Sequence, residues 1–258
     1  MNSGVSFRVM KLALAALTLA LVLSFASLLM GTGCGKSGLA KGGTGPLRIV
    51  FSPMYSSYDG VHVFQIPAVV EGLDNKSVVW SASDPSFVTF SPEPKLGGVI
   101  MTVHKAGMVT VNAALGARTG SSTLNVTAAR LDLWETGRVR YEGNVLDGGI
   151  ADGGVSDGGV AQAREACTVC HGPRGTGPFQ DVSHTPAQAG GFSDEELTRT
   201  FTDGVVPDGG YFDTTLVSYA DWRRFHHWTL TSAESQGIVV YLRGLTPTVQ
   251  TGTTNSGF

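Results

Sequence analysis

The sequence predicts two domains, an N-terminal all-β sandwich followed by an all-α domain, in a protein that is exported. Three observations support this prediction. A basic start and an apolar run open the chain, short runs rich in Val, Ile, Phe and Thr recur up to residue 128, and helix-capping patterns appear after residue 190. Without its leader the chain keeps roughly 225 residues, which is enough for two domains of ordinary size.

Residues 1–33 have the order of a signal peptide. Two basic residues precede a mostly apolar run, 12–30, and small residues follow it directly before Cys34. The run is also long enough for a membrane anchor, since about 20 residues span the hydrocarbon core. Residues 31–33 with Cys34 resemble the lipobox of bacterial lipoproteins, although Gly31 stands where that motif usually has Leu. The resemblance implies a lipoprotein anchored through Cys34 in the periplasm or outer membrane of a bacterium. An uncleaved anchor and ordinary cleavage stay open.

The next part of the chain is predicted to be a tether and a sandwich. Residues 34–46 are Gly-rich and are expected to be flexible. Residues 47–129 hold seven strand-like runs separated by Asp, Pro, Gly and Ser, which predicts an antiparallel sandwich. Within them, "VVWSASDPSFVTF" and "GGVIMTVHKAGMVTVNAALGARTGSSTLNV" resemble the bacterial Ig-like domain of the group-2 type. That resemblance implies a spacer or adhesive module with no chemistry of its own.

Three side chains of the sandwich are better explained by structure than by a site. Trp80 is expected to be the core aromatic, as in other Ig-like folds. His62 and His104 lie in strand-like runs and are expected to be structural or surface residues, not metal ligands. The sandwich is therefore assigned no site.

Three Asp-Gly-Gly units at a five-residue period occupy residues 147–159. Asp and Gly-rich turns can present oxygen ligands to calcium, but the nine-residue calcium repeat and the EF-hand spacing are both missing from the sequence. A solvated insertion at about 144–160 is therefore expected, and calcium binding is not. Residues 248–258 are expected to be a disordered tail.

The cluster with clear chemistry is "CTVCH", Cys167 to His171. On a helical turn, two sulfurs three residues apart point to one side, and an imidazole at the fourth position lies on the same face. This spacing is an attachment signature of c-type haem, in which both thiols form thioethers and the histidine faces the iron. Thioethers would also keep Cys167 and Cys170 from oxidising in an oxidising compartment. A structural zinc site normally needs four ligands, and the chain has only this one cysteine pair.

The flanking segments resemble cytochrome c domains of class I. "CTVCHGPRGTGP" is similar to their haem-binding segment, and "TSAESQGIVVYLRGL" is similar to their C-terminal helix. Gly137 and Tyr141 have the glycine and aromatic spacing of their N-terminal helix. The resemblance implies one covalent haem c in a domain over residues 130–247, with the Asp-Gly-Gly tract as an insertion. The implied haem contacts are the thioethers of Cys167 and Cys170 and the proximal iron ligand His171.

Two helices of this domain are also marked by their own capping residues. Capping boxes are indicated by a Ser or Thr with a Glu three residues later, and a glycine is placed to end each helix. The residues concerned are Ser193, Glu196 and Gly204 for the first helix, and Thr231, Glu234 and Gly244 for the second.

The second axial ligand is where the chain departs from the family. Many cytochrome c domains use a methionine before the last helix, but all six methionines here lie at or before Met108. His226 or His227 in "WRRFHHWTLT" is the preferred candidate, His184 is the second, and an open or water-bound iron is the third. A second imidazole would lower the reduction potential relative to Met/His ligation.

The sequence therefore predicts a membrane-tethered mono-haem cytochrome that transfers one electron, an electron carrier more than an enzyme. Residues 141–258 carry 6 basic and 14 acidic residues, a net charge of −8, which favours a basic redox partner and disfavours nucleic acid. Arg223 and Arg224 are candidates for pairing with the haem propionates. Two alternatives stay open: a haem peroxidase or gas sensor with an open sixth site, and an Ig-like surface-binding or adhesion protein with an accessory haem.

Overall fold

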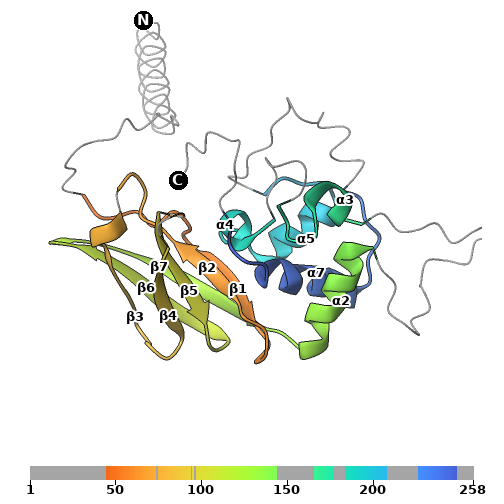
Figure 1. Ribbon diagram of the computed structural model, residues 1–258, viewed down its shortest axis with the longest axis horizontal. Helices are drawn as coiled ribbons and strands as arrows, with labels where there is room; N and C mark the ends of the chain where they lie inside the picture. Colours follow the sequence, from red (N-terminus) through yellow and green to blue (C-terminus); the bar gives the residue numbers. More distant parts are fainter. Residues whose placement is uncertain are drawn as a thin grey trace, which may run out of the picture. The chain divides into compact units, whose positions relative to one another are not determined.

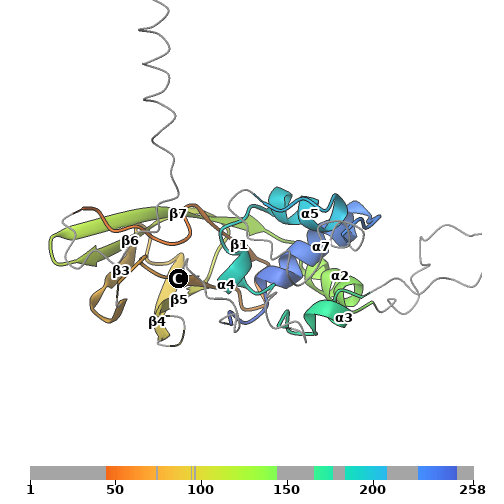
Figure 2. The same ribbon diagram turned by 90° about the horizontal axis from the view of Figure 1, so that it is seen from above.

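The computed structural model describes residues 45–143, 166–176, 184–207 and 226–248, apart from positions 74, 94 and 96 and the side chains of Val169 and Cys170. The described residues belong to one compact unit. In it a β-sandwich is followed along the chain by a group of helices (Figures 1 and 2). No helix within these ranges is long and apolar enough to cross a membrane. The predicted signal peptide, Cys34, the Asp-Gly-Gly tract, all of the tether before residue 45 and all of the C-terminal tail after Thr248 lie outside the described residues.

The sandwich consists of two sheets. β1 pairs in parallel with β7, and the other described strand pairs are antiparallel. The sheets are β1 (Met54–Tyr58), β7 (Arg118–Ala128), β6 (Gly107–Leu115) and β3 (Val79–Ala82), in that order, and β2 (Gln65–Ala68), β5 (Gly98–Val103) and β4 (Val88–Glu93), in that order.

This strand order is that of an immunoglobulin-like domain. A bridge between Ile49 and Val70 adds the segment before β1 to the edge of the β2-β5-β4 sheet. The resulting A-B-E-D arrangement faces a sheet that holds β3, β6 and β7 as its C, F and G strands. The predicted Ig-like sandwich is therefore confirmed.

Two details of the sandwich differ from the expectation. The run that begins at Leu47 was expected to be a full strand, but it pairs only at Ile49, and β1 follows it as a separate strand that no pattern indicated. Trp80 is only partly buried against the core and does not lie at its centre. The centre is formed by alternating inward residues of both sheets, among them Met54, Ile66, Met101, Val111 and Leu124.

The two motif segments behind the Ig-like resemblance contact each other. Asp84 Oδ1 accepts hydrogen bonds from the amide and the hydroxyl of Ser86, which closes the "DPS" turn. Lys105 Nζ, at the start of the "KAG" segment, donates to Asp84 Oδ2 at 2.6 Å and lies 4.9 Å from the centre of the Phe87 ring. The motif residues therefore fix the turn between β3 and β4 to the strand entry of β6.

The helical part begins directly after β7. Its five described helices are α2 (Leu131–Glu142), α3 (Thr168–His171), α4 (Pro186–Ala189), α5 (Asp194–Thr202) and α7 (Ser232–Arg243).

Both predicted capping boxes are confirmed. Ser193 and Glu196 cap α5, and Thr231 and Glu234 cap α7, each by reciprocal hydrogen bonds between side chain and backbone. Gly204 follows the end of α5 with a φ of 61°, and Gly244 is the C-cap of α7.

The closest helix contact is the crossing of α2 and α7, which lie side by side in both views (Figures 1 and 2). Gly137 on α2 and Gly237 on α7 meet at the crossing, where a Cβ on either residue would overlap the backbone of the other helix. Four residues further along each helix, the rings of Tyr141 and Tyr241 lie 5.2 Å apart. The two helices therefore approach backbone to backbone, with aromatic rings beside the contact.

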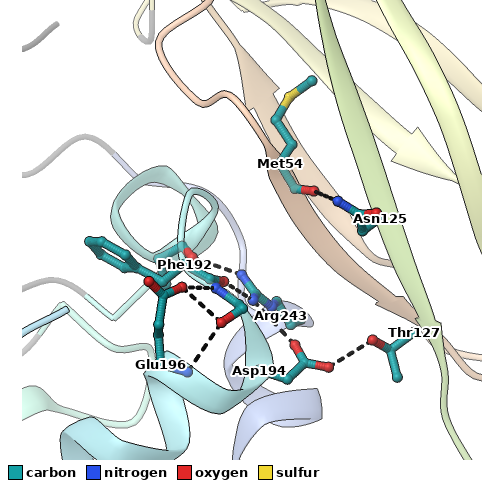
Figure 3. Close-up of polar contacts among 9 residues, drawn as sticks. Met54, Asn125, Thr127, Phe192, Asp194, Glu196 and Arg243 are labelled. Atoms are coloured by element: carbon teal, nitrogen blue, oxygen red, sulfur yellow. Dashed lines mark hydrogen bonds and ion pairs between the residues drawn. The ribbon is translucent and has the colours of Figure 1, made fainter. Parts of the chain in front are cut away.

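The helical part also packs on the sandwich. Leu133 of α2 and Val240 of α7 belong to the same buried apolar cluster as the sandwich core. Arg243, at the end of α7, is 1% exposed and donates to the carbonyl oxygens of Ala189 and Phe192 and to Asp194 (Figure 3). Asp194 in turn accepts a hydrogen bond from Thr127 of β7 at 2.7 Å (Figure 3). The last helix is therefore tied to the sandwich by apolar contacts and by a chain of polar contacts.

Candidate functional site

The Cys-x-x-Cys-His segment forms a helical turn. Cys167 is the N-cap of α3, and the amide of His171 donates to the Cys167 carbonyl oxygen at 2.9 Å. The chain then turns away at Gly172, whose φ is 64°, and again at Gly175, whose φ is 68°. Positive φ angles of this kind favour glycine, so the "HGPRG" sequence ends the helix directly after the histidine.

His171 is buried, with 8% of its surface exposed, and two other imidazoles surround it. The His184 ring stacks on it with a centre-to-centre distance of 3.6 Å and an angle of 28° between the planes. The His226 ring lies at 6.2 Å with an angle of 65°. Three histidines from three separate segments of the chain therefore converge on one place.

His184 is held in position by the loop after α3. Its amide donates to the Gly175 carbonyl oxygen at 2.8 Å, and its Nδ1 lies 3.5 Å from the hydroxyl of Tyr141 on α2. Burial lowers the pKa of His184 well below its ordinary value, and the neighbouring His171 and His226 rings lower it further. His184 is therefore a neutral imidazole at neutral pH.

The segment that carries His226 is joined to the helices on both sides. The amide of Trp228 donates to the Phe201 carbonyl oxygen at the end of α5. The guanidinium of Arg140 lies 4.2 Å from the centre of the Trp228 ring, and its Nε is 3.6 Å from Glu234. Because Glu234 also caps α7, the segment from residue 226 to 230 is placed by the starts and ends of three helices.

The last helix also contacts the loop that follows the motif. The hydroxyl of Tyr241 donates to the Pro173 carbonyl oxygen at 3.0 Å. Tyr241 and Tyr141 are both buried, and burial raises the pKa of each phenol, so both hydroxyls keep their protons. The α2–α7 crossing is thus connected both to the "HGPRG" loop and to His184.

The donor set suits a haem better than a bare metal ion. Among the described residues no group of three or more His, Cys, Asp or Glu side chains is arranged to hold a metal ion. A face-to-face stack of two imidazoles cannot place both ring nitrogens on one small ion, whereas one imidazole at the end of a Cys-x-x-Cys turn is what haem attachment requires. The residues present therefore fit a covalent haem, and His171 is the residue that would hold its iron.

The structure brings some of the predicted site residues together and leaves others apart. It brings together His171, His184 and His226, while His227 is exposed. Cys167 is partly buried at the start of α3. Cys34, Arg223 and Arg224 and the side chain of Cys170 lie outside the description.

Sequence reasoning did not anticipate several residues around the site. Gly237 repeats on α7 the Gly-x-x-x-Tyr spacing of Gly137 and Tyr141, and this repetition is a signal that could have identified the helix crossing. Arg140 and Trp228 carry no such signal, because only the tertiary structure brings them together.

Comparison with known proteins gives likenesses to parts of solved structures, among them Ig domains. No protein-family model matches the chain. No curated protein matches it either. Three solved structures are similar to about a third of the chain. The titin M10–obscurin-like 1 Ig complex has a TM-score of 0.26 and 17% identity over 33% of this chain and 95% of that chain, and titin domain M7 has a TM-score of 0.24 and 18% identity over 33% of this chain and 95% of that chain. Domains 4 and 5 of the S-layer protein SbsC have a TM-score of 0.22 and 15% identity over 32% of this chain and 51% of that chain.

Proposed function

We propose that this chain is an exported, membrane-tethered c-type cytochrome that carries one covalent haem and transfers one electron at a time. The observation that carries the proposal is the helical Cys-x-x-Cys-His turn whose His171 is buried among two further imidazoles. Cys167 and Cys170 form the thioethers, and His171 is the proximal ligand. When bound, the haem supplies an iron that accepts and releases one electron.

His226 is the residue that would supply the second protein ligand to the iron. Two imidazoles that bind one metal ion from opposite sides, each at a metal–nitrogen distance of about 2 Å, have ring centres roughly 6 Å apart. The 6.2 Å between His171 and His226 agrees with this separation, and the 3.6 Å between His171 and His184 does not. Because the His184 ring stacks face to face on His171, it could not present a nitrogen to the iron that His171 would hold. We therefore assign His184 to packing beside His171.

The remaining residues of the site position these ligands and exclude water. Tyr141 and the loop at Gly175 orient His184 against the proximal imidazole. The α2–α7 crossing closes the site from one side with buried apolar side chains. Bis-imidazole ligation favours a lower reduction potential than a Met/His pair, and burial of the site is a second determinant of the potential.

The rest of the chain would bring this site to its partner. Lipid on Cys34 would tether the protein, and the sandwich would hold the helical part as a platform, since the two share apolar and polar contacts. The net charge of −8 over residues 141–258 favours a partner with a basic docking face, and its association rate would fall as salt rises.

The test is the spectrum of the full chain co-expressed with haem-attachment machinery. Reduced protein in pyridine and alkali is expected to show the c-type band with one haem per chain, and this haem is expected to stay with denatured protein. Cys167→Ala with Cys170→Ala is expected to abolish covalent attachment. A parent protein without the c-type band would reject the proposal.

Axial ligation is tested by three matched histidine variants. His226→Ala is expected to convert a six-coordinate low-spin spectrum to a high-spin one, whereas His227→Ala leaves it low-spin. His184→Ala is expected to keep the low-spin spectrum with a shifted potential. A parent protein that is already high-spin would favour the peroxidase or gas-sensor alternative with an open sixth site.

A further inference from the structure

Six aromatic rings follow one another from the surface of the sandwich to the Cys-x-x-Cys-His turn. Neighbouring ring centres are 3.6 to 6.2 Å apart, so each ring contacts the next. The rings come from the loop after β1, from α2 and α7, and from the segments around α3. In order from the surface they are His62, Trp134, Tyr241, Tyr141, His184 and His171.

The outer end of this ring chain, at His62, is fixed by ring stacking and hydrogen bonds. His62 stacks on Trp134 at 4.1 Å with only 10° between the ring planes. Asp59 fixes the loop by accepting hydrogen bonds from the amides of Val61 and His62, and its other oxygen lies 2.6 Å from His62 Nδ1. The imidazole thus has one nitrogen held by Asp59, and 30% of its side chain is exposed.

Two exposed apolar side chains flank this end of the ring chain. Val61 and Val63, on either side of His62, are 66% and 62% exposed. In contrast, Tyr141 and Tyr241 in the middle of the chain are 0% and 5% exposed. The two tyrosines and His171 are therefore shielded from water, Trp134 and His184 are partly buried, and the ring chain reaches the solvent at His62.

We propose that this ring chain is the route by which an electron passes between the iron and the surface at His62. The inference rests on the proposed cytochrome function. Electron tunnelling slows steeply as non-bonded gaps widen, and each gap of the ring chain is a ring contact. An external one-electron donor at His62 loses one electron, and ferric iron bound to His171 gains it. The sandwich, which supplies His62, is then part of the redox unit.

The route is tested with a photochemical donor placed at its outer end. Val63→Cys supplies a thiol beside His62 for a ruthenium tris(bipyridine) label, and Glu195→Cys on the exposed side of α5 supplies a control position away from the rings. A flash excites the label, which loses one electron to the ferric haem. The appearance of ferrous haem in transient absorption gives the transfer rate.

Interrupting the ring chain should slow electron transfer from the label at position 63 but not from the label at position 195. Trp134→Leu is expected to lower that rate several-fold, and Trp134→Phe, which keeps a ring, to lower it less. His62→Ala removes only a surface ring and is expected to slow transfer even if Trp134→Leu does not fold. The rate from position 195 should stay unchanged in all three variants. Equal effects at both positions, or none at position 63, would mean that the rings only pack.

A second readout does not depend on the reaction of the iron. With a soluble cobalt(III) ammine as oxidative quencher, the excited label at position 63 loses an electron to cobalt and then takes one from the nearest oxidisable ring. A tryptophan radical that disappears in Trp134→Phe is expected in the electron paramagnetic resonance spectrum. Its absence from the parent protein would contradict the route. A missing c-type band, in contrast, would reject the cytochrome itself.

Discussion

Gly137 and Gly237 contact each other through their backbones where α2 crosses α7, and neither position has room for a methyl group. Each glycine is followed four residues later by a buried tyrosine, Tyr141 or Tyr241. These tyrosines reach His184 and the Pro173 carbonyl, respectively. The helix crossing therefore places the residues that support His171.

Gly137→Ala is expected to destabilise the protein. In an ordinary helix, replacing Gly by Ala stabilises by about 0.4–1 kcal/mol, but here the added Cβ would overlap the Gly237 carbonyl oxygen. Overpacking of this kind costs about 1–3 kcal/mol. Chemical denaturation measures the change, and the control is Thr136→Ala, a half-buried neighbour on α2 whose hydroxyl bonds only to the Asp132 carbonyl of the same helix, expected within about 0.5 kcal/mol of the parent. A stabilised Gly137→Ala variant would show that the helices do not touch at this point.

Local patterns predicted much of the fold. The helix caps were correct because a capping box needs only residues three positions apart. The sandwich was predicted from alternation and turn residues, but β1, with the sequence "MYSSY", was missed. Its polar serines at positions 56 and 57 are both buried, and β1 pairs in parallel with β7, which comes last among the strands in the sequence, so no local alternation of apolar and polar residues marks this strand.

The candidate site was predictable only where it is local. Cys167 and His171 lie on one turn of helix, so their spacing indicates their chemistry. The convergence of His184 and His226 on His171 depends on two loops and on the α2–α7 crossing, and no short-range pattern encodes it. The sequence named His226, His227 and His184 as candidates, but it could not show that His184 and His226 lie beside His171 while His227 is exposed.

Removing the N-cap side chain of α7 should lower the free energy of unfolding by a measurable amount. Thr231→Ala removes the hydroxyl that accepts from the Glu234 amide at the start of α7, and is expected to lower the free energy of unfolding by about 1 kcal/mol. Ser232→Ala, one residue later and exposed, is the matched control and is expected to change it by less than about 0.5 kcal/mol. Equal effects of the two substitutions in chemical denaturation would argue against the cap.

Asp84 should contribute a pH-dependent term to stability. Its hydrogen bond with Lys105, followed by those with Ser86, lowers the pKa of the Asp84 carboxyl from 3.8 to about 2. Because the pKa is lower in the folded state, the stabilisation is complete above about pH 3.8 and is lost as the pH falls through about 2.

Carboxyl titration by nuclear magnetic resonance should give the low pKa of Asp84, and Lys105→Met should raise this pKa toward 3.8. Asp84→Asn should flatten the dependence of unfolding free energy on pH in this window. An unchanged Asp84 pKa in Lys105→Met would contradict the assignment.

Arg243 should hold the helical part and the sandwich together as one cooperative unit. Its guanidinium is buried, which lowers its pKa, and Asp194 partly offsets this effect. Arg243→Met keeps the apolar stem but leaves the carbonyl oxygens of Ala189 and Phe192 without their donor, and unsatisfied buried groups cost about 1–3 kcal/mol each. The substitution is therefore expected to lower the free energy of unfolding by about 3 kcal/mol. Arg199→Met removes the exposed ion pair with Asp203 and is the control, with an expected change of about 0–1 kcal/mol.

Circular dichroism should show strands and helices of the parent unfolding in one transition, because Asp194 links Arg243 to Thr127 of β7. Two separate transitions in the parent protein would show that the sandwich and the helices are energetically independent despite these contacts.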